Sequence, residues 1–299
     1  MKEQTYIIEN QENFDLTHIF ECGQCFRWEK QQKNSKQNHQ QDQHYIGVVK
    51  NNVIEIWQKG KKVQFKSKGE DNLESLVISY FDLARDYNKI QNQLKKIDKS
   101  METSIQYGKG IRLLNQDLWE TTISFIISAN NNIPRIKGII ERLSKNFGKE
   151  IKYNEKSYYT FPTAEELKDV TIKQYRELGL GFRDKRIYET VQKVLQKEID
   201  LEKLKQNPNT IEVRENLLTL PGVGPKVADC ILLFSDLKRL EVFPIDVWVR
   251  RVMNDLYIKQ EDENKVSKKQ IEELAKQKYG NLAGIAQQYL FYWRRENEG

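Results

Sequence analysis

Cysteine and histidine are scarce in this sequence, and their scarcity excludes several kinds of site. The 299 residues contain three cysteines and three histidines: Cys22, Cys25, Cys230, His18, His39 and His44. Three cysteines are too few for the disulfide framework of a small secreted protein, and they are typical of a reducing compartment. They are also too few for an iron–sulfur cluster held by four cysteines. Because no histidine stands at metal-ligand spacing from them, the sequence predicts no metal site.

Long apolar runs are also missing. No run approaches the roughly 18 apolar residues of a membrane-spanning helix, and the start MKEQTYIIENQE lacks a signal-peptide pattern. We therefore expect a soluble protein inside the cell, with no membrane partner. The net charge of +6 and the pI of 8.9 favour a polyanionic partner such as nucleic acid.

The most informative stretch is LLTLPGVGPKVADCILLFSDLKRLEVFPIDVWVRRVMNDLY, residues 217–257. Its apolar spacing predicts two helices joined by a tight turn, then an extended link and a third helix. Gly222 and Gly224 supply the turn, because glycine accepts backbone conformations that side chains disfavour. Pro225 suits the first position of the second helix, and Asp246 stands where the N-cap of the third helix belongs.

A lysine in the first turn of the second helix needs a reason, because a cation disfavours the positive end of the helix dipole. The free backbone N–H groups at this helix start would hold a phosphate. The same field, together with burial, would lower the pKa of Lys226 and supply some neutral amine as a nucleophile. Considered singly, Lys226 fits equally well a solvated lysine beside a structural turn, and Asp246 a simple helix cap.

The rest of the chain divides by pattern. Residues 1 to about 105 contain short alternating or β-branched runs, which predict strands at Tyr6–Ile8, Tyr45–Val49, Val53–Trp57 and Val63–Phe65, with turns at Asn51-Asn52 and Lys59-Gly60. The tract QQKNSKQNHQQDQ has no apolar residue, and we interpret it as an exposed, disordered hairpin loop. The later chain predicts helices: a buried one over 119–129, one after a capping box at Thr163–Glu166, and a last one over 282–295.

The pair LPGVGPKVADC and FPIDVWV resembles the helix-hairpin-helix and Gly/Pro…Asp motif of the base-excision DNA glycosylases. Within that superfamily the chain is similar to the 8-oxoguanine DNA glycosylases over most of its length. The resemblance implies an α+β fold. Residues 1–105 would form an antiparallel β domain similar to the TATA-binding protein. Residues 106–299 would form a helical body of two lobes, with the lesion pocket between them.

The resemblance assigns the chemistry to two residues of the motif. Lys226, as a neutral amine, would attack the sugar C1′, and Asp246 would stabilise the positive charge that develops on the sugar. The Schiff base that results permits strand cleavage by β-elimination. The implied function is removal of 8-oxoguanine opposite cytosine in duplex DNA, by a monomer that extrudes the damaged nucleotide and is also an AP lyase. No metal or organic cofactor is implied, and a structural cation at the hairpin carbonyls stays open.

Other residues match family positions that contact the base. The segments FECGQCFRW and AGIAQQYLFYW carry most of them. In the first, the carbonyl of Gly23 would accept a hydrogen bond from the damaged base. In the second, Gln287 would read the pairing edge of the base, and Phe291 would stack on one of its faces with Cys230 on the other.

Further positions match residues that contact the duplex. Asn130 would fill the gap left by the extruded nucleotide, while Arg135 and Arg183 would contact the orphaned base. The remaining candidates are Phe182 as an aromatic wedge, the hairpin glycines and a tryptophan after the aspartate, namely Gly222, Gly224 and Trp248. Two of these depart from the family pattern, because tyrosine is commoner at Phe182 and histidine at Trp248.

Two other functions fit parts of the pattern. A monofunctional alkylpurine glycosylase of the same superfamily would have no use for Lys226. A non-catalytic DNA-binding protein would use the hairpin only to hold phosphate. A repair function implies the bacterial cytoplasm or a eukaryotic nucleus, and the Gln-, Asn- and Lys-rich composition favours an AT-rich, bacterial source.

Overall fold

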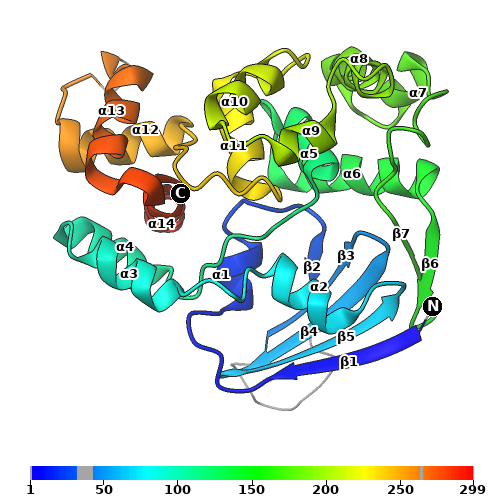
Figure 1. The fold of residues 1–299 in the computed structure, drawn as a ribbon, viewed down its shortest axis with the longest axis horizontal. Helices are drawn as coiled ribbons and strands as arrows, with labels where there is room; N and C mark the ends of the chain where they lie inside the picture. The colour runs from blue at the N-terminus through cyan, green and yellow to red at the C-terminus, as the bar shows by residue number, and fades with distance from the viewer. Residues whose placement is uncertain (1, 32–42, 263–264, 299) are drawn as a thin grey trace.

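An antiparallel sheet lies beside a helical body (Figure 1). The computed structural model describes residues 2–31, 43–262 and 265–298, so the predicted polar hairpin loop lies almost wholly outside the described residues. The sheet followed by helices confirms the predicted α+β fold. Among the helices described, none is both long and apolar enough to cross a membrane.

The sheet contains five strands in the order β1-β5-β4-β3-β2, with every neighbouring pair antiparallel. The strands are β1 (Lys2–Ile8), β2 (Trp28–Lys30), β3 (Gln43–Val49), β4 (Asn52–Lys59) and β5 (Lys62–Gly69). The sequence predicts four of these, each shorter than observed, and misses the three-residue strand β2. A two-stranded hairpin, β6 (Glu150–Tyr153) and β7 (Lys156–Tyr159), is also not predicted.

Both tight turns of the sheet lie one residue away from the predicted pairs. They are formed by Lys50-Asn51 and Gly60-Lys61, and the first residue of each has a left-handed φ, of 52° and 58°. Asn52 belongs to β4 instead, because its side chain is fully buried and its Nδ2 donates to Asp71 Oδ2 at 2.5 Å. This buried polar contact fixes the strand register, and local turn preferences do not predict it.

The two faces of the sheet are covered differently. Helices α1 (Leu16–Phe20) and α2 (Leu73–Tyr80) pack on one face, over a core rich in aromatic residues. The β6–β7 hairpin packs on the other face through a small separate cluster, made of Ile46, Val48, Val53, Ile151 and Tyr153.

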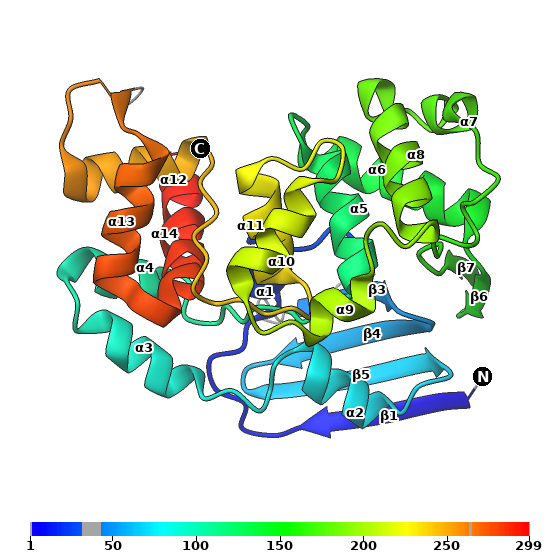
Figure 2. The same ribbon diagram turned by 45° about the horizontal axis from the view of Figure 1, so that its top comes forward.

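The helices form two lobes, which both views separate clearly (Figures 1 and 2). One lobe contains α3 (Tyr87–Lys95), α4 (Lys99–Tyr107), α12 (Val247–Met253), α13 (Lys268–Tyr279) and α14 (Ala283–Glu298). The other contains α5 (Leu118–Ser128), α6 (Ile133–Phe147), α7 (Ile172–Glu177), α8 (Asp184–Leu195), α9 (Leu201–Gln206), α10 (Thr210–Leu218) and α11 (Pro225–Phe234). Because α4 packs on α14, chain from both sides of residue 105 shares one lobe. The division into 1–105 and 106–299 stays a prediction.

The capping box at Thr163–Glu166 forms, but the helix predicted after it is wrong. Glu166 Oε2 accepts from the Thr163 backbone N–H at 2.8 Å, and Thr163 Oγ1 accepts from the Glu166 backbone N–H at 3.2 Å. The chain then makes only turns over 164–169. A second capping box at Thr171 and Gln174 starts α7, so the helix begins at Ile172, two residues after the β-branched Val170.

Side-chain caps fix the loops that lie between the lobes. Asn132 Oδ1 accepts from the Arg135 backbone N–H at 3.0 Å and starts α6. Asp246 Oδ1 accepts from the Val249 backbone N–H at 2.8 Å and starts α12, which confirms the predicted N-cap. Between α5 and α6, Asn130 takes a left-handed φ of 52°, so the asparagine segment turns sharply there.

Candidate active site

The predicted helix–hairpin–helix joins α10 to α11 and puts Lys226 in the first turn of α11. Gly222 has a φ of +83°, a conformation that favours glycine. Gly224 is the N-cap of α11, and Pro225 is its first residue. The Lys226 side chain is half-buried, with Nζ 5.4 Å from the centroid of the Phe125 ring. The lysine is therefore held inside the protein and is not a solvated surface residue.

Six of the predicted residues converge on one pocket between the two lobes. The pocket is lined by residues of α11, of the link before α12, of α14 and of the segment before β2: Lys226, Cys230, Asp246, Gln287, Phe291 and Gly23. These are all the residues that the sequence predicts for catalysis and for base binding. Local spacing explains two pairs among them, since each pair is four residues apart on one helix. The meeting of four separate segments is a property of the fold.

The pocket is small. It holds about 40 Å³, room for roughly three waters, whereas ligand pockets usually hold about 300–1,000 Å³. The Phe291 ring lies against Gly23, where an added Cβ would be 3.3 Å from Phe291 Cε1. Gln287 is 4% exposed, and its Oε1 makes no hydrogen bond to any described residue. A ligand that entered the pocket would meet this unsatisfied amide.

The ionisation of the pocket differs from the sequence expectation at Lys226. Burial raises the pKa of the Cys230 thiol to about 11. The pKa of Lys226 is raised, first by the Cys230 sulfur and also by the Asp246 carboxylate, and together they exceed the opposing effect of burial. The expected lowering of this pKa is therefore wrong. The expectation of a lowered pKa rests on the helix start and on burial, and it leaves out the Asp246 carboxylate, which comes from a different segment.

Asp246 carries both a structural and an electrostatic function. Burial raises the pKa of this carboxyl, while the hydrogen bond from Val249 and the charge of Lys226 lower it. With Lys226 held as an ammonium at neutral pH, the pocket contains a cation beside a half-buried carboxyl group. The lysine has to lose a proton before its nitrogen can act as a nucleophile.

The residues predicted to contact the duplex gather on the tips of the loops around α5, α6 and α8. Arg183 is 1% exposed, and its Nη2 donates to the carbonyls of Ala129 at 2.5 Å and Asn130 at 2.7 Å. Arg135 Nη2 donates to the Gly179 carbonyl at 3.3 Å. The two arginines therefore tie the asparagine segment to the segment before α8. Their predicted base contacts would need an exchange of these bonds.

Phe182 is an exposed aromatic residue on this surface. This residue is 56% exposed. The centroid of its ring lies 4.2 Å from the Arg183 guanidinium and 5.0 Å from the Arg186 guanidinium. Arg186 also lies against the hairpin, because a Cβ on Gly222 would be 2.5 Å from Arg186 Cδ. We refer to Asn130, Arg135, Phe182, Arg183 and Arg186 as the loop-tip cluster. Burial lowers the pKa of Arg183, and the charges of Arg135 and Arg186 act in the same direction.

Two predicted residues lie apart from the loop-tip cluster. Gly224 is open, since a Cβ there would meet no atom within 4 Å. Trp248 lies in the first turn of α12, half-buried, with the Arg251 guanidinium 5.4 Å from its ring. Trp248 and its arginine neighbour thus present an aromatic and cationic surface beside the Asp246 end of the pocket.

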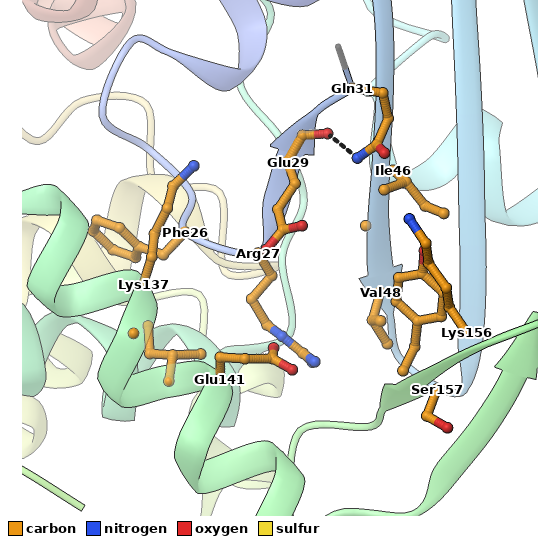
Figure 3. A pocket seen from close by; sticks show the side chains of 14 residues that line it. Phe26, Arg27, Glu29, Gln31, Ile46, Val48, Lys137, Glu141, Lys156 and Ser157 are labelled. Carbon is orange, nitrogen blue, oxygen red and sulfur yellow. Dashed lines mark hydrogen bonds between the residues drawn. The ribbon is translucent and has the colours of Figure 1, made fainter. Parts of the chain in front are cut away.

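A larger cavity lies elsewhere, between α6, the sheet and β7 (Figure 3). It holds about 380 Å³ and contains none of the predicted site residues. The Arg27 side chain enters it between α6 and β3 (Figure 3), with Nη2 donating to the Tyr159 carbonyl at 2.5 Å and Nη1 3.8 Å from Glu120. Arg27 holds β7 against the sheet, so this space is defined by packing between layers.

The structure also adds residues that the sequence does not single out. Five more line the pocket, namely Cys22, Phe125, Phe234, Pro244 and Gln288. Phe125 and Phe234 look like ordinary core residues in apolar helices. Gln288 stands next to Gln287, but neighbouring residues on a helix point in different directions, so spacing alone gives no signal. Among the described residues, no three His, Cys, Asp or Glu side chains come together as a metal site would require.

Comparison with known proteins agrees with this geometry. Residues 6–122 match the family described as 8-oxoguanine DNA glycosylase, N-terminal domain, and residues 123–279 match the HhH-GPD superfamily of base excision DNA repair proteins. The chain is 33% identical over 264 residues to an N-glycosylase/DNA lyase of Saccharomyces cerevisiae, covering 81% of this chain and 68% of the relative. It is 32% identical over 248 residues to a probable N-glycosylase/DNA lyase of Methanothermobacter thermautotrophicus, covering 76% and 77%.

A solved structure is similar over the whole chain. It is the 8-oxoguanine glycosylase/lyase of Clostridium acetobutylicum in complex with double-stranded DNA containing cytosine opposite 8-oxoG. The TM-score is 0.90 at 41% identity, with 100% of this chain and 98% of the other covered. The chain belongs to the HhH-GPD superfamily of base excision DNA repair proteins and, within it, to the 8-oxoguanine DNA glycosylases that are also DNA lyases.

Proposed function

We propose that this protein excises 8-oxoguanine from duplex DNA when the base lies opposite cytosine, with Lys226 as nucleophile and Asp246 as its electrostatic partner. The observation that carries the proposal is the convergence of Lys226 and Asp246 with the four base-binding candidates in one pocket. Because one chain supplies all six residues, we propose that it acts as a monomer. We expect it to act where the genomic DNA is, in a bacterial cytoplasm or a eukaryotic nucleus.

The reaction begins when the neutral amine of Lys226 attacks the sugar C1′ of the extruded nucleotide. The C1′–N9 bond breaks, and its electron pair leaves with the base, which then takes up a proton. Asp246 stabilises the positive charge on the sugar during this step. The attached nitrogen then loses one proton, and the sugar ring opens with O4′ taking up a proton, which gives a protonated Schiff base between Nζ and C1′. Removal of a C2′ proton then expels the 3′ phosphate, which cleaves the strand.

Recognition of the damage falls to Gly23 and Gln287. The two guanine bases differ at position 8 and at N7, which carries a proton only in 8-oxoguanine, so a carbonyl from Gly23 would accept a hydrogen bond from the damaged base alone. The buried, unsatisfied Oε1 of Gln287 supports its assignment to the pairing edge. A buried polar partner can reject an analogue that lacks the matching group by about 10⁴–10⁵.

Sodium borohydride trapping tests the proposal against both alternatives. With a duplex containing 8-oxoguanine opposite cytosine, the proposed chemistry gives base release and a covalent protein–DNA complex. A monofunctional alkylpurine glycosylase would release an alkylated base without a covalent complex, and a non-catalytic DNA-binding protein would do neither. Absence of both trapping and 8-oxoguanine release would overturn the proposal.

A further inference from the structure

The backbone of Glu21–Gln24 is held by side chains at every carbonyl except one. The Glu21 carbonyl accepts from Arg295 Nη2, and the Cys22 carbonyl accepts from Gln288 Nε2 at 2.6 Å. The Gln24 carbonyl accepts from Gln116 Nε2 at 2.7 Å. Within the part of the chain that the structure describes, no hydrogen bond reaches the Gly23 carbonyl. The carbonyl proposed to recognise the base is therefore the one left free.

Gly23 needs this support because its own backbone is permissive. Its φ is +84°, and glycine loses more conformational freedom on ordering than any other residue. The Cys22 carbonyl belongs to the peptide plane that enters Gly23, so a fixed hydrogen bond there orients the residue. Gln24 fixes the other side, since its Nε2 donates to the carbonyls of Ile19 and Arg112, both at 2.8 Å.

Two of the three donors come from α14, the helix that also carries Gln287 and Phe291. Gln288 is 1% exposed, and the Arg295 guanidinium lies 5.4 Å from the Phe291 ring centroid. A Cβ on Gly23 would be 3.4 Å from Arg295 Nη1, so this guanidinium lies directly beside the glycine. The helix α14 thus carries both base-binding candidates, Gln287 and Phe291. It also carries the two residues that support the Gly23 segment.

We propose that Gln288 and Arg295, which we call the α14 clamp, are positioning residues that aim the Gly23 carbonyl at the base. This inference rests on the proposed function. Among the described residues no hydrogen bond joins Gln288 or Arg295 to Lys226, so the clamp should contribute to recognition of the base and not to Schiff-base chemistry. A site held to sub-ångström tolerance loses about 10²-fold in rate when a supporting contact is removed.

The test compares two substrates that share the lysine chemistry. One is a duplex with 8-oxoguanine opposite cytosine, and the other carries an abasic site, which has no base to recognise. Gln288→Met keeps the side-chain length and removes the donor. We expect it to excise 8-oxoguanine about 10²-fold more slowly, while borohydride trapping on the abasic duplex stays within about twofold of the wild-type rate.

Gln58→Met is the matched control. Gln58 is also buried, and its Nε2 donates to the Phe14 carbonyl at 2.7 Å, in the sheet and away from the pocket. It should lose stability without a selective loss of excision. If Gln288→Met excises 8-oxoguanine at the wild-type rate, or loses both activities equally, the clamp is overturned.

A second variant keeps the proposal testable if Gln288→Met does not fold. Arg295 is only partly buried, and Arg295→Met removes the donor to the Glu21 carbonyl. We expect the same selective loss of excision on 8-oxoguanine, about tenfold. Equal losses on both substrates, or none, would contradict the clamp. A wild-type protein that traps on neither substrate would instead overturn the proposed function, so the two failures are distinguishable.

Discussion

The pocket and the loop-tip cluster differ in how their polar groups are engaged. In the pocket, Gln287 Oε1 and the Gly23 carbonyl have no hydrogen-bond partner among the described residues. In the loop-tip cluster, by contrast, the guanidinium groups of Arg135 and Arg183 already donate to backbone carbonyls. A buried polar group without a partner costs free energy that a matching ligand can recover. The pocket is thus prepared for a ligand, whereas the loop tips have to exchange existing bonds for contacts with DNA.

The difference separates two requirements of the reaction. Recognition needs fixed groups with unused bonding capacity, and the proposed base-binding groups, Gln287 Oε1 and the Gly23 carbonyl, have it. Access to a stacked base needs loops that change partners when the duplex distorts. We therefore expect substitutions in the pocket to affect rate with little effect on stability. Substitutions in the loop-tip cluster should also affect stability where the side chain is buried, as that of Arg183 is.

The largest effect is expected at Asp246. Asp246→Asn keeps the ability to cap α12 and removes the negative charge near the sugar. Excision should fall by about 10²–10³-fold, while the free energy of unfolding changes by less than about 1 kcal/mol. Single-turnover excision and chemical denaturation measure the two quantities. An asparagine variant with near-normal turnover would reduce Asp246 to a structural cap.

The pH dependence should follow the proton on Lys226. Because the pKa of Lys226 is raised, the nucleophilic form is scarce at neutral pH and increases about tenfold per pH unit. The raised pKa of Asp246 acts in the same sense, since its negative charge is lost as the pH falls. Excision should therefore rise steadily between about pH 6 and 9. Single-turnover rates across this range that stay flat would show that loss of this proton does not limit the reaction.

Substitutions of Arg135 and Arg183 in the loop-tip cluster should differ in their effect on stability. Arg135→Ala should weaken the preference for cytosine over the other opposite bases by about 1–3 kcal/mol, and leave stability unchanged, because Arg135 makes one bond at the surface. Arg183→Ala should also lower the free energy of unfolding by about 3 kcal/mol, since the carbonyls of Ala129 and Asn130 lose the donor that this buried side chain supplies. Excision opposite all four bases and thermal unfolding measure these effects. Equal wild-type rates opposite every base would remove the assignment of both arginines to the orphaned base.

The smallest effects are expected at the two hairpin glycines, whose substitutions should differ in their effect on stability. Gly222→Ala forces a side chain into a left-handed conformation and against Arg186, which should cost about 1–2 kcal/mol of stability. Gly224→Ala meets open space and should change stability by less than about 0.5 kcal/mol. Both should weaken DNA binding if the hairpin N–H groups hold phosphate. Unfolding curves that coincide for the two variants would show that the Gly222 conformation carries no strain penalty.

The sequence itself predicts several of the helices and four strands, because these depend on local periodicity, whereas the base-binding candidates of the pocket come from the resemblance to the glycosylases. It does not predict that Lys226 is protonated, since the groups that raise its pKa include Asp246, which comes from beyond α11. Nor does it predict the burial of Arg183, because an arginine in a glycine-rich loop looks like a surface residue. Each of these depends on a contact between segments that local spacing does not encode.

Contacts that local spacing does not encode also explain the smaller differences between the predicted and the observed structure. The helix expected after Thr163 has a complete capping box, yet its chain continues only as turns before a second cap takes over. The β3–β4 turn is displaced by one residue because the buried side chain of Asn52 donates to the half-buried Asp71. Gln288 gives no sequence signal at all, since its function depends on the Cys22 carbonyl 266 residues away.

The identity of the reacting amine is the central claim, and peptide mapping of the trapped complex tests it directly. The wild-type protein is reduced with borohydride on a duplex containing 8-oxoguanine opposite cytosine, then digested and sequenced by mass spectrometry. We expect the sugar remnant on Lys226 alone, and no trapped complex from Lys226→Gln, which should still bind the lesion duplex. A remnant on another lysine or on the N-terminal amine, with trapping retained in Lys226→Gln, would contradict the account.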